Sequence, residues 1–235
     1  MNVPNTLLRV LLDAVWPECC LNCRGEVGRD AVAAPGLRLW DRPHLCGGCL
    51  DRLAGSAART EVAGIPVAGG SRTGREIVAL VGAMKYHGVR GLAAPLGALM
   101  ADALRDSMDE FAPEVLVPVP LHRRRKAERG FNQAELLASV AGRRCGLPVR
   151  TDVVKRIRGT GQQAKVANSV EARAGNVAGA FRAKRESGGG RIVIIDDIVT
   201  TGSTVLATAD ALRAAGWTVV GIAAVGAAVD PEPPS

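Results

Sequence analysis

With 235 residues, the chain is long enough for one well-buried domain and a small appendage, and its 47% apolar and 23% charged residues exclude intrinsic disorder. Only 3% of the residues are aromatic, so the core must consist mainly of Val, Ile, Leu and Ala, which suits a buried parallel sheet flanked by helices. The formal net charge of +7 favours a polyanionic partner: a polyphosphate metabolite, a nucleic acid or an anionic membrane surface.

The N-terminal stretch at 7–16 is apolar, but Arg9 and Asp13 interrupt it, so it lacks the core of a signal peptide. Its apolar residues recur at helical spacing, which predicts a short amphipathic helix. The longest apolar run, 216–229, is too short to span a bilayer and carries three glycines. We therefore expect a soluble, cytoplasmic protein.

Five of the six cysteines lie in the first fifty residues, and four of them form two Cys-x-x-Cys pairs, Cys20 with Cys23 and Cys46 with Cys49. Each pair can form a tight turn whose thiolates point at one ion, so the two pairs together predict a tetrahedral zinc site. With all four positions filled, such a zinc ion would be structural and would staple a segment that has few large apolar residues.

Two alternatives remain open for this segment. Either pair could be a redox dithiol, although no thioredoxin-like βαβ pattern surrounds them. Cys19 or His44 could also replace one of the four assumed ligands. The isolated Cys145 falls in a helical stretch and is expected to be a buried, small apolar residue.

The middle of the chain gives weaker signals. Residues 51–71 are rich in Ala, Gly and Pro and are expected to form a connector with room for one short strand. Residues 77–86 suit a strand or a short helix, and 92–108 have helical spacing. The β-branched run at 115–120 predicts a buried strand whose prolines mark its exit. A helix is predicted at 132–144 and a short strand at 152–156.

Residues 159–169 have no apolar period and are expected to form a mobile loop, with a helix at about 170–177 after it. Farther along, the sequence predicts a strand at 191–197, a helix at 204–215 and a strand at 217–225. A strand, a helix and a strand in this order form a right-handed crossover in a parallel sheet, so the predicted fold class is α/β.

Candidate site residues gather where the strand at 191–197 meets the next helix. Asp196 and Asp197 end this strand, at the edge where open α/β sheets hold ligands. Two acceptor-only carboxylates suit the two vicinal hydroxyls of a ribose. The residues that follow supply hydroxyls and backbone N–H groups at a helix N-terminus, which is a phosphate cradle: Thr200, Thr201, Gly202, Ser203 and Thr204.

Each of these features also has an ordinary structural explanation. Paired aspartates can cap a turn, and Ser or Thr before a helix is a common N-cap. The basic run at 122–126, with Arg129 close behind, could equally be a solvated loop. The combination of buried strand, two carboxylates, hydroxyl-rich turn and helix is hard to reach by accident, and it predicts a site for a phosphorylated sugar.

The segment at 194–204 resembles the motif that binds 5-phosphoribosyl 1-pyrophosphate (PRPP) in type I phosphoribosyltransferases. The segments VPVPLHRRR at 117–125 and RGFNQAELLA at 129–138 are similar to the signature of the ComF family, also called the ComFC or GntX group. KYHG at 85–88, Arg173 with Asn176, and the two Cys-x-x-Cys pairs are similar to the same family. The likeness covers roughly 16–225, and the spacing between Gln163 and Arg173 is longer than in the family pattern.

The resemblance implies an N-terminal zinc-binding module at 1–55, a type I phosphoribosyltransferase-like domain at 56–230 and a disordered tail at 231–235. It implies an enzyme that transfers phosphoribose from PRPP to a small, nitrogenous acceptor and releases pyrophosphate. Members of the family are associated with DNA uptake during natural competence.

Roles for individual residues follow from the same resemblance. The 5-phosphate is expected at residues 200–204 and the ribose at Asp196 and Asp197. The pyrophosphate is expected in a loop after the strand at 115–120, and Mg²⁺ is expected to arrive with it; the residues concerned are Leu121, His122, Arg123 and Arg125. The catalytic set, which includes residues in or beside a lid over the site, is Arg129, Arg156 and Gln163.

Two other function classes fit the same residues. The chain could be a sensor that binds PRPP or a nucleotide without turnover. It could also be a competence factor that handles single-stranded DNA or contacts DNA-uptake proteins, with the zinc module and the basic run as the grip. One Tyr, three Phe and three Trp weaken this last alternative, because single-strand grooves usually stack bases on aromatic side chains.

Overall fold

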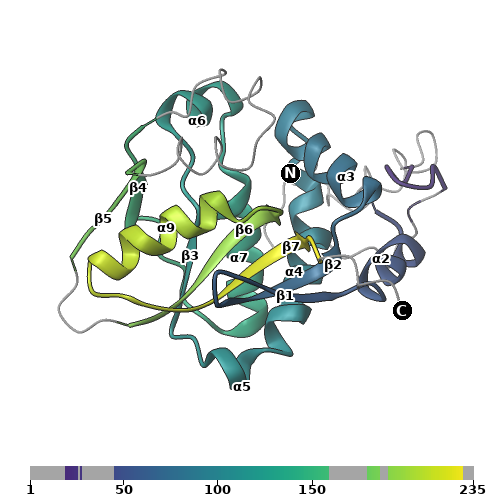
Figure 1. The fold of residues 1–235 in the computed structure, drawn as a ribbon. Helices are drawn as coiled ribbons and strands as arrows, with labels where there is room; N and C mark the ends of the chain where they lie inside the picture. The colour runs from purple at the N-terminus through teal and green to yellow at the C-terminus, as the bar shows by residue number, and fades with distance from the viewer. Residues whose placement is uncertain (1–18, 26, 28–44, 159–178, 186–189, 230–235) are drawn as a thin grey trace, which may run out of the picture.

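The structure is a computed structural model, and it describes residues 19–25, 27, 45–158, 179–185 and 190–229. At its centre lies a five-stranded sheet with the order β1-β2-β7-β6-β3 (Figure 1). Only β1 is antiparallel, because β2, β7, β6 and β3 run parallel. The strands are β1 (Ala58–Val62), β2 (Ile65–Arg72), β3 (Val115–Pro118), β6 (Arg191–Val199) and β7 (Thr218–Ala227). The expected α/β class with a mostly parallel sheet is confirmed.

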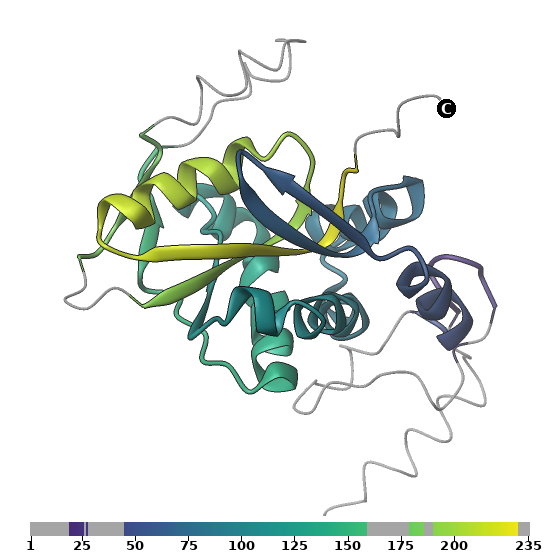
Figure 2. The ribbon, with the colours of Figure 1, turned by 60° about the horizontal axis from the view of Figure 1, so that its bottom comes forward.

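Helices cover both faces of this sheet (Figure 2). Helix α9 (Ser203–Ala214) and a small antiparallel ribbon of β4 (Val154–Arg156) and β5 (Phe181–Ala183) cover one face. Three helices cover the other face: α3 (Arg75–His87), α4 (Ala93–Arg105) and α7 (Gln133–Cys145). Each face therefore has its own apolar cluster.

The pleat of β6 divides its side chains between these clusters. Ile192 and Ile194 pack in the cluster under α9, whereas Val193 and Ile195 pack in the cluster under α3, α4 and α7. All four are fully buried, as expected for a central parallel strand. The same alternation decides which way the residues that follow along β6 must face.

Short helices complete the described part of the chain. Helix α2 (Gly47–Ala54) begins directly after Cys46, the first member of the second cysteine pair, and its Cys49 and Leu53 join the cluster under α4. The others are η1 (Arg90–Leu92), α5 (Met108–Phe111) and α6 (Arg123–Arg129). Within the described residues, no helix combines the length and the apolar character needed to cross a membrane.

Most predicted elements are confirmed within a few residues. The ambiguous stretch at 77–86 is helical and forms most of α3. The strand predicted at 152–156 is β4. The elements predicted at 7–16 and 170–177, the loop at 159–169 and the C-terminal tail lie outside the described residues.

The connector expected at 51–71 is wrong. This stretch contains the second half of α2 and a hairpin of β1 and β2. A two-residue turn joins the two strands, and its Ala63 and Gly64 both have positive φ angles, as in type I′ turns. Strand β2 was missed because small residues replace the usual β-branched ones. A Cβ atom on Gly70 would lie 2.9 Å from the backbone of Leu99, so α4 can pack closely on β2 only where the strand has no side chain.

Candidate functional site

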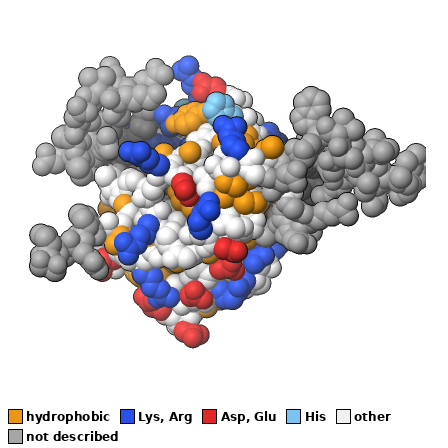
Figure 3. Space-filling view, turned by 90° about the vertical axis from the view of Figure 1, so that its right-hand side faces the viewer, with side chains coloured by type: hydrophobic (Ala, Val, Ile, Leu, Met, Phe, Trp, Pro, Cys, Tyr) orange, Lys and Arg blue, Asp and Glu red, His pale blue; other side chains and the backbone are white. Residues whose placement is uncertain are grey.

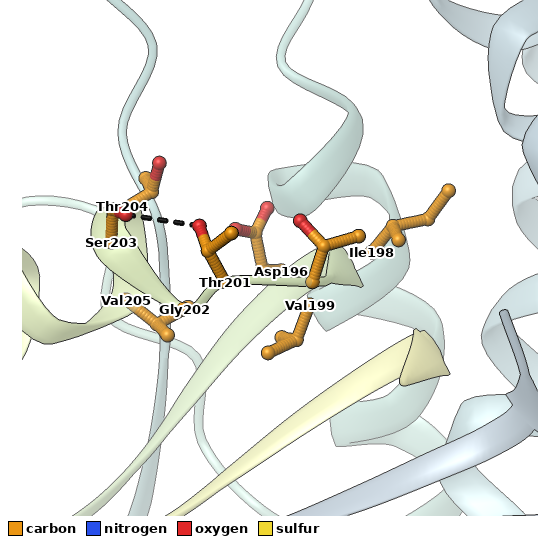
Figure 4. Close-up of a pocket in the computed structure, with 9 residues that line it drawn as sticks. Asp196, Ile198, Val199, Thr201, Gly202, Ser203, Thr204 and Val205 are labelled. Atoms are coloured by element: carbon orange, nitrogen blue, oxygen red, sulfur yellow. Dashed lines mark hydrogen bonds between the residues drawn. The ribbon is translucent and has the colours of Figure 1, made fainter. Parts of the chain in front are cut away.

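The carboxyl end of β6 opens into a small hollow of about 60 Å³ that one continuous segment lines (Figure 4). The lining comprises Asp196, Ile198, Val199, Thr200, Thr201, Gly202, Ser203, Thr204 and Val205. All five residues predicted to cradle a phosphate therefore share one hollow with a carboxylate predicted to bind ribose. The segment between β6 and α9 brings them together without help from distant parts of the chain.

The hydroxyl-rich turn at 200–204 leads directly into α9. Thr201 Oγ1 and Ser203 Oγ lie 3.0 Å apart in a hydrogen bond, the dashed line in Figure 4. No side chain caps the start of α9, so the N–H groups of its first turn remain available to an anion in the hollow. Such a helix start favours a phosphate both by hydrogen bonding and by its positive partial charge.

Gly202 is required at its position in this turn for two reasons. Its φ angle is +71°, in the left-handed region that side chains rarely adopt. A Cβ atom there would also overlap Val62 Cγ1, at the end of β1. The hairpin that sequence analysis missed thus supports the floor of the hollow.

Asp196 and Asp197 lie within β6, because the strand continues to Val199 rather than ending at Asp197 as predicted. Asp196 pairs in register with Ala224 of β7. Neighbouring residues of a strand point to opposite faces, so the two carboxylates cannot have the same surroundings. Asp196 lines the hollow on the α9 side, and Asp197 faces α3 and α7.

The half-buried Asp196 carboxyl has a raised pKa. Burial, followed by the charge of Asp197, raises the pKa of Asp196 to about 7, although the Asp197 N–H donates a 2.8 Å hydrogen bond to Asp196 Oδ1 and Lys85 and Arg156 oppose the change. Because ionisation of this carboxyl group is unfavourable in the absence of a ligand, hydroxyl donors or a cation would stabilise its charged form strongly.

Asp197 is buried, and both of its oxygens have partners. Lys85 Nζ, from the last turn of α3, donates to Oδ1 at 2.6 Å. Gln133 Nε2, at the start of α7, donates to Oδ2 at 2.7 Å, and Gln133 Oε1 accepts a hydrogen bond from Arg129 Nη1. A continuous polar network therefore runs from α3 through β6 and α7 to the end of α6.

The residues predicted to face pyrophosphate surround the start of α6. The prediction of a loop through Arg125 is wrong from Arg123 onward, because α6 begins there, with His122 Nδ1 accepting from the Arg124 N–H at 3.4 Å as its N-cap. Leu121 and His122 are half-buried, whereas Arg123 and Arg125 are exposed. The basic residues at 123–126 of α6 are all exposed to solvent, whereas Arg129 at its end is half-buried.

Arg156 in β4 lies on the Asp196 side of the sheet. Burial and then the charge of Arg125 lower the pKa of Arg156, and Asp196 opposes this shift. Its guanidinium also stacks 5.3 Å from the ring centre of Phe181 in β5. The charges of Arg125 and Asp196 therefore both influence Arg156. The third residue of the predicted catalytic set, Gln163, lies outside the described residues.

The four predicted metal ligands form a separate cluster. The Sγ atoms of Cys20, Cys23, Cys46 and Cys49 all lie within 4.8 Å of one another. Four sulfurs about 2.3 Å from a tetrahedral zinc ion would be about 3.8 Å apart, and the Cys23 and Cys46 Sγ atoms are 3.7 Å apart. The cluster therefore fits a metal such as zinc.

The cysteines of the cluster differ in acidity, because burial raises the pKa of Cys49 to about 12 whereas Cys20 favours the thiolate. Burial alone would raise the pKa of Cys20, but backbone hydrogen bonds at Cys23, Cys46 and Asn22 lower it to about 6. Arg52 Nη2 lies 3.0 Å from Cys49 Sγ. Among the described residues Cys19 is not part of the cluster, and His44 lies outside them.

Lys85 and Gln133 were not predicted as site residues. Both lie in segments that resemble the ComF family, KYHG and RGFNQAELLA, and this was the available signal. Sequence spacing could not bring them to Asp197, which lies 112 residues beyond Lys85 and 64 residues beyond Gln133.

Residues 97–233 match the family described as phosphoribosyl transferase domain, which covers more than half of the chain. Apart from β1 and β2, the sheet lies inside this match, and so does the hydroxyl-rich turn at the carboxyl end of β6. The chain belongs to the phosphoribosyl transferase domain family.

Curated relatives connect the chain more narrowly with competence proteins. It is 36% identical over 107 residues to Competence protein F of Haemophilus influenzae, which is 44% of this chain and 46% of that protein. It is 35% identical over 144 residues to DNA utilization protein YhgH of Salmonella typhimurium, covering 60% and 63% of the two chains. Competence protein ComFC of Bacillus subtilis is 36% identical over 92 residues, 38% of this chain and 34% of that one. The resemblance to the ComF family is confirmed.

These matches to curated relatives span less than two thirds of the length of each relative.

Among solved structures, adenine phosphoribosyltransferase from Thermoanaerobacter pseudethanolicus is similar with a TM-score of 0.36 and 14% identity, over 76% of this chain and 99% of that one. TT1426 from Thermus thermophilus has a TM-score of 0.33 and 14% identity, over 59% and 84%. TM-scores this low establish nothing by themselves, and the fold class rests on the family match and the strand order.

Proposed function

We propose that the chain binds PRPP at the carboxyl end of β6 and transfers its phosphoribosyl group to a small, nitrogenous acceptor, with release of pyrophosphate. The observation that supports this best is the hollow that Asp196 shares with the turn at 200–204. It offers a carboxylate for sugar hydroxyls beside a helix start for a phosphate, which are the two chemistries of one phosphorylated ribose.

The 5-phosphate is assigned to the turn and the first residues of α9. Hydroxyls of Thr200, Thr201, Ser203 and Thr204 would donate to its oxygens together with backbone N–H groups, and Gly202 keeps the turn tight. The exposed Thr200 and Thr201 before the buried Gly202 and the half-buried Ser203 and Thr204 after it support this assignment.

The ribose hydroxyls are assigned to the aspartates of β6, with Asp196 as the direct ligand because it lines the hollow. Asp197 already accepts from Lys85 and Gln133, so it would reach the ribose only through its remaining lone pairs. The raised pKa of Asp196 supports this role, because hydroxyl donors or a cation brought by the ligand would stabilise its ionised form.

Pyrophosphate is assigned to the start of α6, where Leu121 and His122 lead into Arg123 and Arg125, with Arg129 at the end of the helix. Cationic side chains here would neutralise charge on the leaving group as the bond between C1 and pyrophosphate breaks. Mg²⁺ bound to the pyrophosphate would find a hard oxygen ligand in Asp196.

The transfer breaks the bond from C1 to the pyrophosphate oxygen and forms one from C1 to the acceptor nitrogen. Positive charge develops on the ribose between these events, and water must be kept away from it. Arg156 beside the site, and Gln163 in the following segment, are proposed to close over the bound substrate.

The cysteine cluster is proposed to hold zinc in a structural role. Four thiolates would fill all positions of a tetrahedral ion and leave none for substrate. The burial of Cys20 and Cys49 in the same apolar cluster as α4 supports a role in folding rather than in chemistry.

Isothermal titration with PRPP and Mg²⁺ tests the binding site. We expect Asp196→Asn to weaken binding by about tenfold or more at pH 8, because an amide replaces a charged acceptor, whereas Asp210→Asn, an exposed substitution on α9, should leave it unchanged. No heat from the wild-type protein would contradict the proposal. A screen of nitrogenous acceptors for pyrophosphate release then separates an enzyme from a sensor.

A second candidate function is the binding of single-stranded DNA. The names of the relatives and the exposed arginines of α6 favour it. On the face seen in Figure 3, however, Lys and Arg are spread among acidic side chains rather than gathered in one patch. Such binding should weaken steeply with salt, and Arg123→Ala with Arg125→Ala should reduce it. Salt-independent binding would count against this function.

A further inference from the structure

The polar network beneath the proposed site converges on Asp197, which is 3% exposed. Its two oxygens are held from two different helices, by Lys85 Nζ at 2.6 Å and Gln133 Nε2 at 2.7 Å. An ionised carboxylate at this depth would be unstable without such partners. The cation in contact with Asp197 is the ammonium group of Lys85, a residue in the last turn of α3.

The orientation of Gln133 follows from these contacts. A carboxylate can only accept hydrogen bonds, so the NH₂ group of the amide must face Asp197 and its oxygen must face away. The oxygen then accepts from Arg129 Nη1, on the last turn of α6. Asp197 in its charged form therefore fixes, through Gln133, the guanidinium that is proposed to face pyrophosphate.

We infer that Lys85 is a positioning residue of the proposed phosphoribosyl site, which fixes the Asp197 carboxyl group through their ion pair and, through Gln133, orients Arg129 toward the pyrophosphate. This inference rests on the proposed function and adds to it two residues that touch neither the hollow nor the reacting atoms. It also explains how two adjacent aspartates can coexist on one buried strand.

The charged groups around the pair come from three elements in the described part of the chain. Lys85 comes from α3 and Arg156 from β4, and both lower the pKa of Asp196, while Asp197 raises it. Arg125 of α6 acts on Arg156. The strands beside β6 present no charge here, since Ala224 is the register partner of Asp196 and Pro118 is that of Ile195.

The test compares Lys85→Met, Lys85→Arg and Gln133→Leu with the wild-type protein. PRPP with Mg²⁺ is titrated into each protein at one pH. We expect Lys85→Met to bind PRPP about tenfold more weakly, because Asp197 loses its ion-pair partner and no longer holds Gln133 and Arg129 in place. Lys85→Arg should restore the wild-type affinity, and Arg105→Met, which removes a cation from an exposed ion pair, should not differ from wild type.

Gln133→Leu separates the two halves of the inference. It keeps the Lys85–Asp197 pair but removes the link to Arg129, so PRPP affinity should fall by about tenfold. This variant also serves if Lys85→Met does not fold. Wild-type affinity in Gln133→Leu would overturn the link to Arg129.

A measurement without PRPP tests the role of Lys85 independently. The side-chain Nε–Hε resonance of Arg129 is compared by NMR at one pH, and it should shift in Lys85→Met as it does in Gln133→Leu, and return in Lys85→Arg. An unchanged Arg129 resonance in Lys85→Met would overturn the inference. Wild-type protein that binds no PRPP would contradict the proposed function, whereas normal binding with unaltered behaviour of Lys85→Met would contradict the role of Lys85 alone.

Discussion

At the scale of single residues, neighbours in sequence have opposite environments. Asp196 lines a hollow beside hydroxyls, and Asp197 is buried against Lys85 and Gln133. The pleat of β6 produces this difference, because it sends successive side chains to opposite faces of the sheet. One carboxylate is thereby placed for a ligand, and the other ties three helices to the strand.

Asp196 should make stability depend on pH. Its folded-state pKa, about 7, lies above its ordinary value of 3.8, so the folded state retains a proton that the unfolded state releases. Stability is then lost as pH rises from about 4 to about 7. We expect Asp196→Asn to be more stable than wild type by about 1–3 kcal/mol at pH 8, with little difference near pH 4. Urea unfolding at both pH values measures this, and equal stability at pH 8 would refute the raised pKa.

At the scale of elements, the hairpin of β1 and β2 supports the site from beneath. Val62 of β1 packs where a side chain on Gly202 would otherwise lie, and β2 carries the small residues that let α4 approach. The cost of this arrangement is weak strand propensity in β2, which tertiary packing overrides.

Gly70→Ala tests this close packing. A methyl group there would lie 2.9 Å from Leu99 backbone atoms in α4, so we expect a loss of about 1–3 kcal/mol from overpacking. Gly82→Ala in α3 is the matched control, because nothing lies within 4 Å of the added atom and alanine favours a helix. Thermal unfolding of both variants decides the matter, and equal melting temperatures would show that α4 can move away.

At the scale of the whole molecule, the cysteine-rich segment is joined to the body through its core. Cys20, Leu45, Cys49 and Leu53 share one apolar cluster with residues of α3, α4 and α7. Unfolding of the cysteine-rich segment should therefore destabilise the part of the chain that contains the sheet.

Removal of metal should destabilise the full chain. Chelation should release about one zinc ion per chain and lower the melting temperature of the main transition, because the ligands contribute to the shared core. Cys49→Ser should have the same effect, and Cys145→Ser, outside the cluster, serves as the control. Metal analysis that recovers no zinc would end the assignment, and an unchanged main transition would show that the segment unfolds independently.

Much of the site was accessible from the sequence because it is local. Residues 196–205 follow one another through strand, turn and helix, so spacing alone places the hydroxyls and Asp196 in one hollow. The two Cys-x-x-Cys pairs are likewise local, and metal geometry limits how they can combine.

The sequence by itself determined the α/β class, the hydroxyl-rich turn at 200–204 and the four cysteines, since each depends on short-range periodicity or spacing. Only the tertiary structure decided that Lys85 and Gln133 meet Asp197 and that β1 and β2 form a hairpin. These contacts join segments far apart in the chain or replace residue propensity by packing, and no pattern within a single segment encodes them.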